Sequence, residues 1–356
     1  MKEKPYEKNN YIDLTRTIAM FGVVLCHCLL FFSSNLFWFV NADYQSDGAV
    51  FLCNILNFTV VQIFVFCSGF LFQASLQSKQ TGIPAMILKR AKRLLLPFLL
   101  YGALWLVPTY TIFDIPTYGR PKGTSLLDGY KSMLLGQFCD VAWFLLMLFW
   151  VTLIWILLRV LLKKKLIFVG AAAAVALYFA AHFLLSEVNF YSISQIDIYI
   201  VVFSAGAAFY WISDKINNLP LAAIFAISIS GIAACVALSP FASNYPVYCV
   251  FAIIMPVFVV ILAMGICKLK LQDRVEKSRV YKWLLKHNMD IYLLQAPGMY
   301  LSFMWLYPLV GQNCALCVTL CFISTLAIDF ALVALLTLIR KGLSAIFKSV
   351  KKGEKT

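Results

Sequence analysis

The chain has 356 residues, of which 62% are hydrophobic and only 13% are charged, and its mean hydropathy is +0.85. Soluble domains carry about 25% charged and about 45–50% apolar residues, so this composition excludes a soluble globular protein. The net charge of +14 does not indicate a nucleic-acid partner, because the lysines and arginines lie in short clusters between long apolar segments. The sequence therefore predicts one integral membrane domain in a lipid bilayer.

Apolar segments of about 20 residues, each able to cross a hydrocarbon core of about 30 Å as a helix, follow one another along the chain. The predicted fold class is an all-α integral membrane bundle of about ten transmembrane helices. They lie at approximately residues 12–33, 50–73, 94–113, 141–162, 166–185, 196–212, 218–238, 246–267, 288–309 and 313–339. We expect residues 1–340 to form the transmembrane domain and residues 341–356 to form a basic cytoplasmic tail.

The positions of the basic residues predict the orientation of this bundle. With the N-terminus inside, 26 of the 30 lysines and arginines lie in segments assigned to the cytoplasm. Only Arg120, Lys122 and Lys131 lie in segments assigned to the outside. Because basic loops stay on the cytoplasmic side of a membrane, both termini are predicted to be cytoplasmic. One helix more or fewer would destroy this asymmetry.

Arg16 and His27 are the first candidate functional residues, and both lie in the first apolar segment. Eleven positions are about three full turns of helix, so both side chains should project from one face, about 16 Å apart along the axis. Ionisable groups within a membrane usually face a protein interior or a water-filled cavity. Histidine is also well suited to proton transfer near neutral pH. The alternatives are a histidine that only bonds a neighbouring helix and an arginine that only extends to the membrane surface.

Arg90 and Arg93 belong to the basic segment Lys89-Arg90-Ala91-Lys92-Arg93, which precedes the third predicted helix. One interpretation is that this cluster does no more than orient the chain in the membrane. The spacing of three, however, places both guanidinium groups on one helix face. There they could bind phosphate groups together, as a fork of planar donors.

Three more polar residues in apolar segments have two interpretations each. Asp13 lies one turn before Arg16 and either orients it or is an acidic residue favoured at a helix start. Ser68 precedes Gly69. A Ser-Gly pair in an apolar helix more often permits close helix packing than provides a nucleophile. Asp329 lies in the last predicted helix and either pairs with a buried polar group or conducts protons.

Five short segments, spread from residue 12 to about residue 300, form an ordered set. They are Ile12-Asp13-Leu14-Thr15-Arg16-Thr17-Ile18-Ala19 running to Val24-Leu25-Cys26-His27, Phe64-Val65-Phe66-Cys67-Ser68-Gly69-Phe70-Leu71, Arg90-Ala91-Lys92-Arg93 with Pro97, Trp143-Phe144-Leu145, and Asp290-Ile291-Tyr292-Leu293-Leu294-Gln295-Ala296-Pro297. This order resembles the membrane-bound acyltransferase-3 family, which pairs an arginine with a histidine after ten intervening residues. Its later helices carry similar segments, and Gln295 stands where many relatives have a histidine. No catalytic role is therefore assigned to Gln295.

The resemblance implies an acyltransferase of the O-acetyltransferase type in the cytoplasmic membrane of a bacterial cell. It would move an acyl group from cytoplasmic acyl-CoA to a hydroxyl of an extracytoplasmic carbohydrate or glycan. Arg90 and Arg93 would bind the phosphates of the donor. Arg16 would mark the inner mouth of a cavity, and His27 would be either the general base toward the acceptor hydroxyl or a transient acyl carrier.

Other positions are less directly implied. Trp143 and Tyr292 either line the path of the acceptor or thioester, or anchor the protein at the membrane interface. His287 lies outside the matching segment and is expected to be solvated at the cytoplasmic end of its helix. No permanently bound cofactor and no metal are expected, because the pair Cys314-x-x-Cys317 lies in an apolar helix without a second pair.

Two other functional classes stay open from the sequence. A secondary transporter of a sugar or a lipid-linked intermediate would also need intramembrane charges, and ten helices would suit it. A non-catalytic partner in polysaccharide assembly is the other, although the intact pairs Arg16–His27 and Arg90–Arg93 argue against a relative that has lost activity. The acyl group is expected to be acetyl, with succinyl as the alternative, and the sequence determines neither the acceptor nor the oligomeric state.

Overall fold

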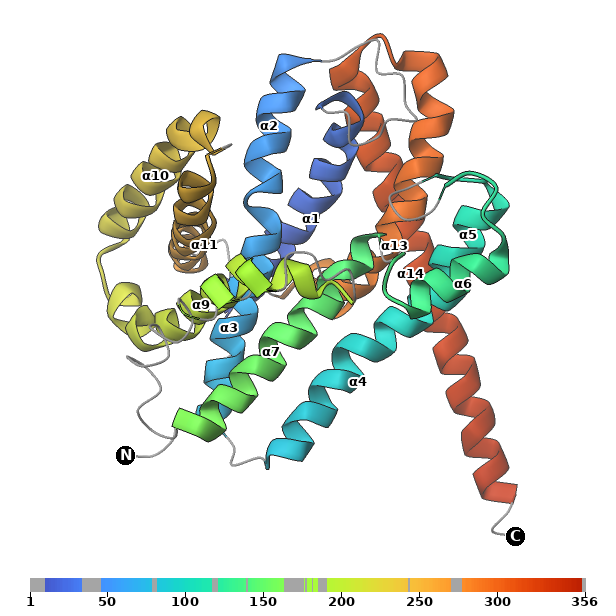
Figure 1. The fold of residues 1–356 in the computed structure, drawn as a ribbon, viewed down its shortest axis with the longest axis horizontal. Coiled ribbons are helices and arrows are strands. Elements are labelled where there is room, and N and C mark those ends of the chain that lie inside the picture. Colours follow the sequence, from blue (N-terminus) through green and yellow to red (C-terminus); the bar gives the residue numbers. More distant parts are fainter. Residues whose placement is uncertain are drawn as a thin grey trace.

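A computed structural model shows a bundle built of helices (Figure 1). It describes residues 10–33, 46–78, 82–116, 121–138, 140–162, 176, 178–180, 182–184, 191–242, 244–269 and 277–353. No strand occurs among these residues, so the predicted all-α fold is confirmed. The elements are α1 (Asn10–Ser33), α2 (Asp47–Asn57), α3 (Val60–Ser78), α4 (Ile83–Tyr101), the turn η2 (Gly102–Leu106), α5 (Val107–Ile112), α6 (Leu126–Leu134), η3 (Asp140–Ala142), α7 (Trp143–Leu162), η5 (Ile193–Gln195), α9 (Ile196–Asn217), α10 (Leu221–Leu238), η6 (Ser239–Phe241), α11 (Tyr245–Cys267), α13 (Arg279–Val310) and α14 (Cys314–Gly353).

Eight helical segments of the described chain are long and apolar enough to cross a membrane. They are Asn10–Ser33, Asp47–Leu76, Ile83–Ile112, Asp140–Leu158, Ile196–Asn217, Leu221–Phe241, Tyr245–Cys267 and Cys314–Gly342. They confirm the prediction of a polytopic membrane protein. Of the two other predicted spans, residues 166–185 lie mostly outside the described residues. Residues 288–309 lie within α13, where buried polar side chains such as Gln295 and Ser302 lower the hydropathy.

The helices differ from the predicted ranges at several places. The second predicted span is broken at Phe58 and Thr59 into α2 and α3. The third begins at Ile83 instead of residue 94, with a proline in its first turn, where a missing backbone N–H costs nothing. Arg90 and Arg93 are consequently on the helix and not in the loop before it. The last helix, α14, has 40 residues and continues through residue 340, so the tail boundary predicted there lies inside a helix and stays a prediction.

The turn η2 joins α4 to α5 as a short π-helix. Val107 donates its backbone N–H to the carbonyl of Gly102, five residues earlier, instead of four as in an α-helix. This wider turn adds one residue to the spiral without ending it. It therefore changes the direction in which every side chain of α5 projects, relative to a continuous α-helix.

Helix ends gather at two opposite ends of the bundle (Figure 1). The start of α4 and the ends of α3, α7 and α14 lie at the bottom, whereas the start of α2 and the turn between α13 and α14 lie at the top. The bottom is therefore the end next to the basic segments that the sequence assigns to the cytoplasm. Which end faces the cytoplasm stays a prediction.

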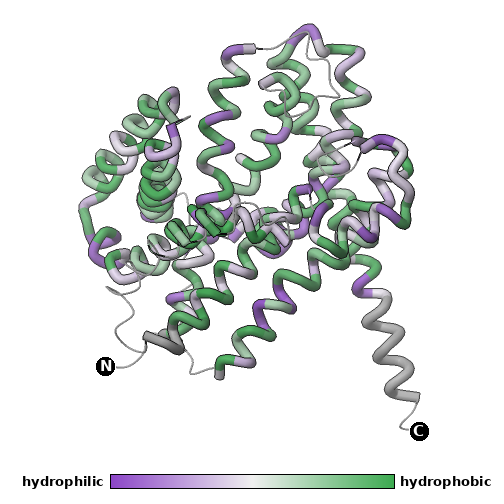
Figure 2. The backbone as a smooth tube through the Cα atoms, in the orientation of Figure 1, coloured by the Kyte–Doolittle hydropathy of each residue, from purple (hydrophilic) through white to green (hydrophobic). Residues whose placement is uncertain are grey.

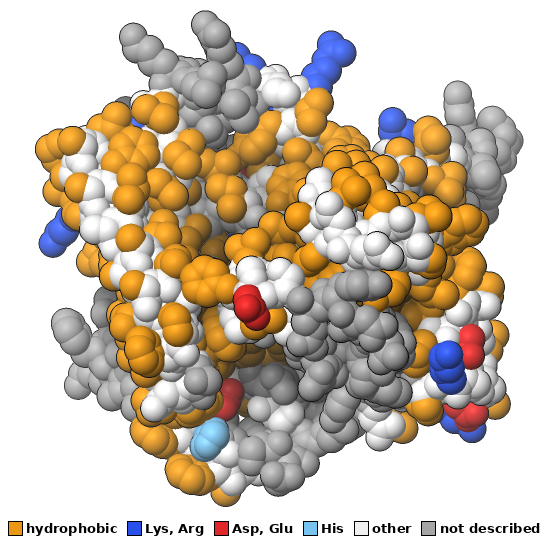
Figure 3. Space-filling model, turned by 90° about the horizontal axis from the view of Figure 1, so that it is seen from above, with side chains coloured by type: hydrophobic (Ala, Val, Ile, Leu, Met, Phe, Trp, Pro, Cys, Tyr) orange, Lys and Arg blue, Asp and Glu red, His pale blue; other side chains and the backbone are white. Residues whose placement is uncertain are grey.

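Hydrophobic residues cover the outside of the bundle as well as its interior. The tube in Figure 2 is hydrophobic along most of α7, α10 and α11, and the face in Figure 3 carries mainly hydrophobic side chains with few charged ones. Leu104 and Ile112 are each 75% exposed, and Trp305 and Leu309 are each 78% exposed. Apolar surface of this extent is unfavourable in water and is expected where lipid covers the protein.

Helix α1 occupies the centre of the bundle. Within the described chain it packs against α2, α3, α11, α13 and α14. Its buried side chains are found along its whole length, from Ile12 to Phe32. Any polar group on α1 therefore lies among other helices, and this central position is what brings Arg16 and His27 into the interior.

Helices α3 and α9 cross through two glycines. A Cβ atom on Gly69 would lie 2.0 Å from the backbone oxygen of Phe203, and one on Gly206 would lie 2.0 Å from the backbone oxygen of Phe66. Small residues permit backbones to approach this closely in membrane proteins. The close packing expected at the Ser68–Gly69 pair is therefore present.

We predict that Gly69→Ala or Gly206→Ala lowers the stability of the protein by about 1–3 kcal/mol, because the added methyl group meets a backbone oxygen that cannot move aside. Thermal unfolding of the purified protein in detergent measures the effect. Gly342→Ala is the helical control, since a Cβ there has no neighbour within 4 Å. Equal thermal midpoints for Gly69→Ala and Gly342→Ala would contradict the packing described for α3 and α9.

Candidate active site

His27 projects from α1 toward α13. Its Nδ1 lies 3.5 Å from Oε1 of Gln295, and the amide nitrogen of Gln295 donates to the carbonyl of Tyr292 at 3.1 Å. Because the amide nitrogen is already engaged, the oxygen of Gln295 is the atom that faces His27. An amide oxygen only accepts, so Nδ1 of His27 carries the hydrogen and Nε2 keeps its lone pair. The contact thus selects the tautomer in which Nε2 can act as a base.

Gln295 is the residue at which the sequence departs from the acyltransferase-3 pattern. It is 1% exposed and lies directly beside His27, so the departure affects the candidate site itself. An amide neither gains nor loses a proton near neutral pH. Gln295 can therefore orient the imidazole of His27 by accepting a hydrogen bond. It cannot take a proton from His27 or supply one to it.

Arg16 lies eleven residues before His27 on α1, and its backbone also contacts α13. The side-chain amide of Asn288 donates to the backbone carbonyl of Arg16 at 3.3 Å, so α13 bonds α1 at both positions. The Arg16 side chain is half-buried, and its charge and that of Asp13 act on the thiol of Cys67 in α3. Arg16 is therefore inside the bundle at the interface of α1 and α3.

Arg90 and Arg93 lie on one face of α4, near its start. The guanidinium carbon of Arg90 is 5.4 Å from the ring centre of Phe72 in α3, a cation–π contact, whereas Arg93 is exposed. The two positive charges are close enough to act on each other. A bound anion would relieve this repulsion, and a phosphate group suits two guanidinium groups.

Tyr292 and Trp143 both lie inside the bundle. The hydroxyl of Tyr292 donates to the carbonyl of Val141 at 2.8 Å, and its ring is 5.6 Å from that of Phe144. Tyr292 is 3% exposed, so its interpretation as an interfacial anchor is wrong. Trp143 is half-buried, with its ring 5.9 Å from that of Tyr199.

Ser68 bonds within its own helix. Its Oγ donates to the carbonyl of Phe64, one turn earlier, at 2.8 Å. This bond is common for serines in apolar helices, because it satisfies the hydroxyl where no water is present. The structure therefore gives Ser68 a backbone contact and supports the packing interpretation of the Ser68–Gly69 pair.

Asp329 is fully buried in α14. Neither of its carboxyl oxygens has a hydrogen-bond partner within the described part of the chain. Its Oδ1 faces the backbone of α13 at Gly298, where a Cβ atom would lie 3.5 Å away. Pairing with a buried polar group, one of the two interpretations of Asp329, is absent among these residues.

The expectation that His287 is solvated is wrong. Its side chain is 4% exposed, and its Nδ1 lies 2.8 Å from Oδ2 of Asp290, one turn later. The other oxygen of Asp290 accepts from Tyr101 at 2.5 Å and lies 3.7 Å from Arg340. The reason is that α13 begins at Arg279, well before its predicted start, so His287 is inside the helix. The spacing of three between His287 and Asp290 was the signal in the sequence for this pair.

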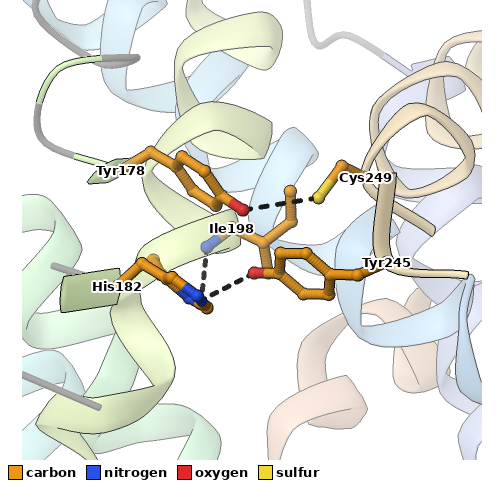
Figure 4. Close-up of polar contacts among 6 residues, drawn as sticks. Tyr178, His182, Ile198, Tyr245 and Cys249 are labelled. Atoms are coloured by element: carbon orange, nitrogen blue, oxygen red, sulfur yellow. Dashed lines mark hydrogen bonds and ion pairs between the residues drawn. The ribbon is translucent and has the colours of Figure 1, made fainter. Parts of the chain in front are cut away.

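A second cluster, which sequence reasoning missed, joins α9 and α11 (Figure 4). Oδ2 of Asp197 lies 3.3 Å from Nδ1 of His182 and accepts from the hydroxyl of Tyr245 at 3.0 Å. The ring of His182 stacks on Tyr245 at 5.4 Å and on Tyr178 at 6.0 Å. Tyr178 in turn contacts the thiol of Cys249 at 3.7 Å. These polar groups are paired with one another, so the cluster connects helices and is not an open site.

We predict that Asp329→Asn keeps or raises the thermal stability, because an unpartnered buried carboxyl group carries a desolvation cost that the neutral amide reduces. The expected gain is up to about 1 kcal/mol in unfolding free energy. Thermal unfolding in detergent measures it. A clear loss of stability would mean that the carboxyl group has a compensating partner beyond the described residues.

Comparison with known proteins identifies the family of the chain. A family model described as an acyltransferase domain, of the acyltransferase-3 type, matches residues 9–338, which is nearly the whole chain. No curated protein and no solved structure matches the chain. The matched region contains α1 with Arg16 and His27, the basic face of α4, and α13 with Gln295. The chain therefore belongs to the acyltransferase-3 family of membrane proteins and is an acyltransferase.

Proposed function

We propose that this acyltransferase transfers an acyl group, most simply acetyl, from cytoplasmic acyl-CoA to a hydroxyl of an extracytoplasmic carbohydrate or glycan. The protein would act in the cytoplasmic membrane of a bacterial cell. The observation that carries the proposal is the contact of His27 with Gln295, because it leaves the lone pair of Nε2 available inside the bundle. Membership of an acyltransferase family favours this function over a secondary transporter.

The two ends of the donor would lie at different depths. Arg90 lies seven residues after the start of α4, about 10 Å from the bottom end of that helix. His27 lies six residues before the end of α1, about 9 Å from its top end. A donor with phosphates at Arg90 and Arg93 would therefore extend its thioester arm into the bundle to reach His27.

The reaction can proceed at one nitrogen of His27 by either of two routes. Nε2 of His27 takes the proton of the acceptor hydroxyl while the oxygen attacks the thioester carbonyl. The C–S bond then breaks, and the thiolate of CoA receives the proton from the imidazolium, so that ester and free thiol are the products. In the second route, Nε2 attacks the thioester first, the C–S bond breaks and CoA leaves as the thiolate. The hydroxyl then attacks the acyl-imidazolium, its proton passes to the thiolate, and the bond between Nε2 and the acyl carbon breaks to release the ester. Both routes use the same nitrogen.

We predict that His27→Ala abolishes acyl transfer without loss of folding, because it removes the only base that the proposed mechanism uses. Release of free thiol from acetyl-CoA by purified protein and the mass of the repeat unit of cellular polysaccharide measure the activity. His182→Ala is the control, since His182 lies in the separate cluster on Asp197. Transfer at the normal rate by His27→Ala protein would refute the mechanism.

We also predict that Arg90→Gln raises the KM for acetyl-CoA about tenfold, which corresponds to the loss of one charge-assisted contact with phosphate. Lys92→Gln is the matched control, because Lys92 lies on the same turn of α4 and is exposed. The measurement is thiol release at varied concentrations of acetyl-CoA. Equal KM values for the two variants would remove the basic face of α4 from the donor site.

A further inference from the structure

Asp140 lies at the start of η3, where the chain enters α7. Its φ angle is +39°, in the left-handed region that few residues other than glycine adopt. The carboxylate is turned toward α5, where it accepts a hydrogen bond from the hydroxyl of Tyr110. Asp140 directly precedes the predicted span at residues 141–162. A backbone held in this region often marks a functional position, which prompts the question of what Asp140 faces.

One chain of contacts leads from Asp140 to α1. Its partner Tyr110 packs edge to face on Tyr300 of α13, with ring centres 5.5 Å apart. Tyr300 packs edge to face on Phe31 at 5.7 Å. Phe31 is one turn after His27 on α1. Asp140 is therefore two aromatic side chains away from the turn of α1 that follows His27.

A second chain of contacts leads to the same place from the other side. Val141, which follows Asp140, accepts from the hydroxyl of Tyr292. The carbonyl of Tyr292 accepts from Gln295, and Gln295 contacts His27. Both chains of contacts pass through α13, and the first reaches α1 one turn beyond His27, at the side away from Arg16. Side chains of α13 therefore connect Asp140 with the candidate active site.

The groups around Asp140 suit a polyhydroxylated ligand. Its negative charge acts on the hydroxyls of Tyr110, Tyr292 and Tyr300. A carboxylate accepts hydrogen bonds from hydroxyl groups, and a phenol both donates and accepts, so together they can bind neighbouring hydroxyls of a sugar. No lysine or arginine pairs with Asp140 in the described part of the chain. An acidic ligand would therefore meet an uncompensated negative charge.

We propose that Asp140 and Tyr110 form the acceptor subsite of the enzyme, and that this subsite selects uncharged polyhydroxylated acceptors. Asp140, which is half-buried, would accept hydrogen bonds from one or two hydroxyls of the sugar and hold a further hydroxyl toward Nε2 of His27. This inference rests on the proposed function. The competing explanation is that the bond between Asp140 and Tyr110 only fastens η3 to α5.

The test uses the full-length protein in lipid nanodiscs, with acetyl-CoA as donor and with N-acetylglucosamine, glucose and glucuronate as acceptor probes. KM values for donor and acceptor are measured separately by thiol release. Asp140→Asn is expected to raise the KM of the neutral sugars about tenfold, as for loss of a charged hydrogen bond, and to leave the KM of acetyl-CoA unchanged. It is also expected to reduce the discrimination against glucuronate. Tyr110→Phe should raise the KM of the neutral sugars less, because the carboxylate stays.

Asp114→Asn is the matched control. Asp114 has the same residue type and also a left-handed φ, of +46°, but its Oδ1 accepts from the backbone of Gly123 at an exposed loop. An unchanged acceptor KM in Asp140→Asn protein of normal thermal stability would overturn the inference and leave the proposed function intact. Equal changes in donor and acceptor KM together with a lower thermal midpoint would establish the fastening role instead, and so also overturn it. Wild-type protein that releases no more thiol than His27→Ala with every probe would overturn the proposed function and the inference with it.

Discussion

Helix α13 is bonded to α1 by amide groups, at Asn288 and at Gln295, and the positions of the other site residues depend on these two contacts. In lipid an amide is neutral and needs no counter-ion, but it still loses free energy if it is left without a partner. The two bonds therefore determine how far α13 can rotate or slide along α1. Because Tyr292 lies on the same helix, its bond to Val141 also aligns the start of α7 with α1.

The serine and threonine hydroxyls on and near α1 also need hydrogen-bond partners within the protein. Thr15 and Thr17 donate to carbonyls one turn earlier at 2.7 and 2.9 Å, as Ser68 does in α3. Each of these three hydroxyls is thereby satisfied within its own helix and needs no partner on another helix. Asp329 differs, since neither oxygen of its buried carboxyl group has a hydrogen-bond partner in the described part of the chain. The packing of the surrounding helices must offset the free-energy cost of burying this group.

Much of the fold follows from the sequence, because the length and hydropathy of each apolar segment and the positions of the basic residues are local properties. They determine which segments cross a bilayer and in which direction. The backbone of Arg16 and the side chain of His27 both contact α13, whereas the shared face of the two side chains stays a prediction. The contact of His27 with Gln295 joins residues 268 positions apart, so no spacing rule reveals it. His287 was misjudged because the start of α13 was placed too late. Asp140 was overlooked because its direction depends on a φ angle of +39°, which local patterns do not specify.

The π turn between α4 and α5 controls the direction of Tyr110. Each residue of an α-helix advances the side-chain direction by about 100°. With the additional residue in Gly102–Leu106, Tyr110 projects toward η3 and reaches Asp140. A chain shortened by one residue in this turn would form a regular helix at little local cost, yet Tyr110 would then face away from η3. The five residues of this turn thus set the rotation of α5, which contacts Asp140, relative to α4, which carries Arg90. An insertion or deletion in the turn would change the proposed acceptor subsite and leave the helix itself intact.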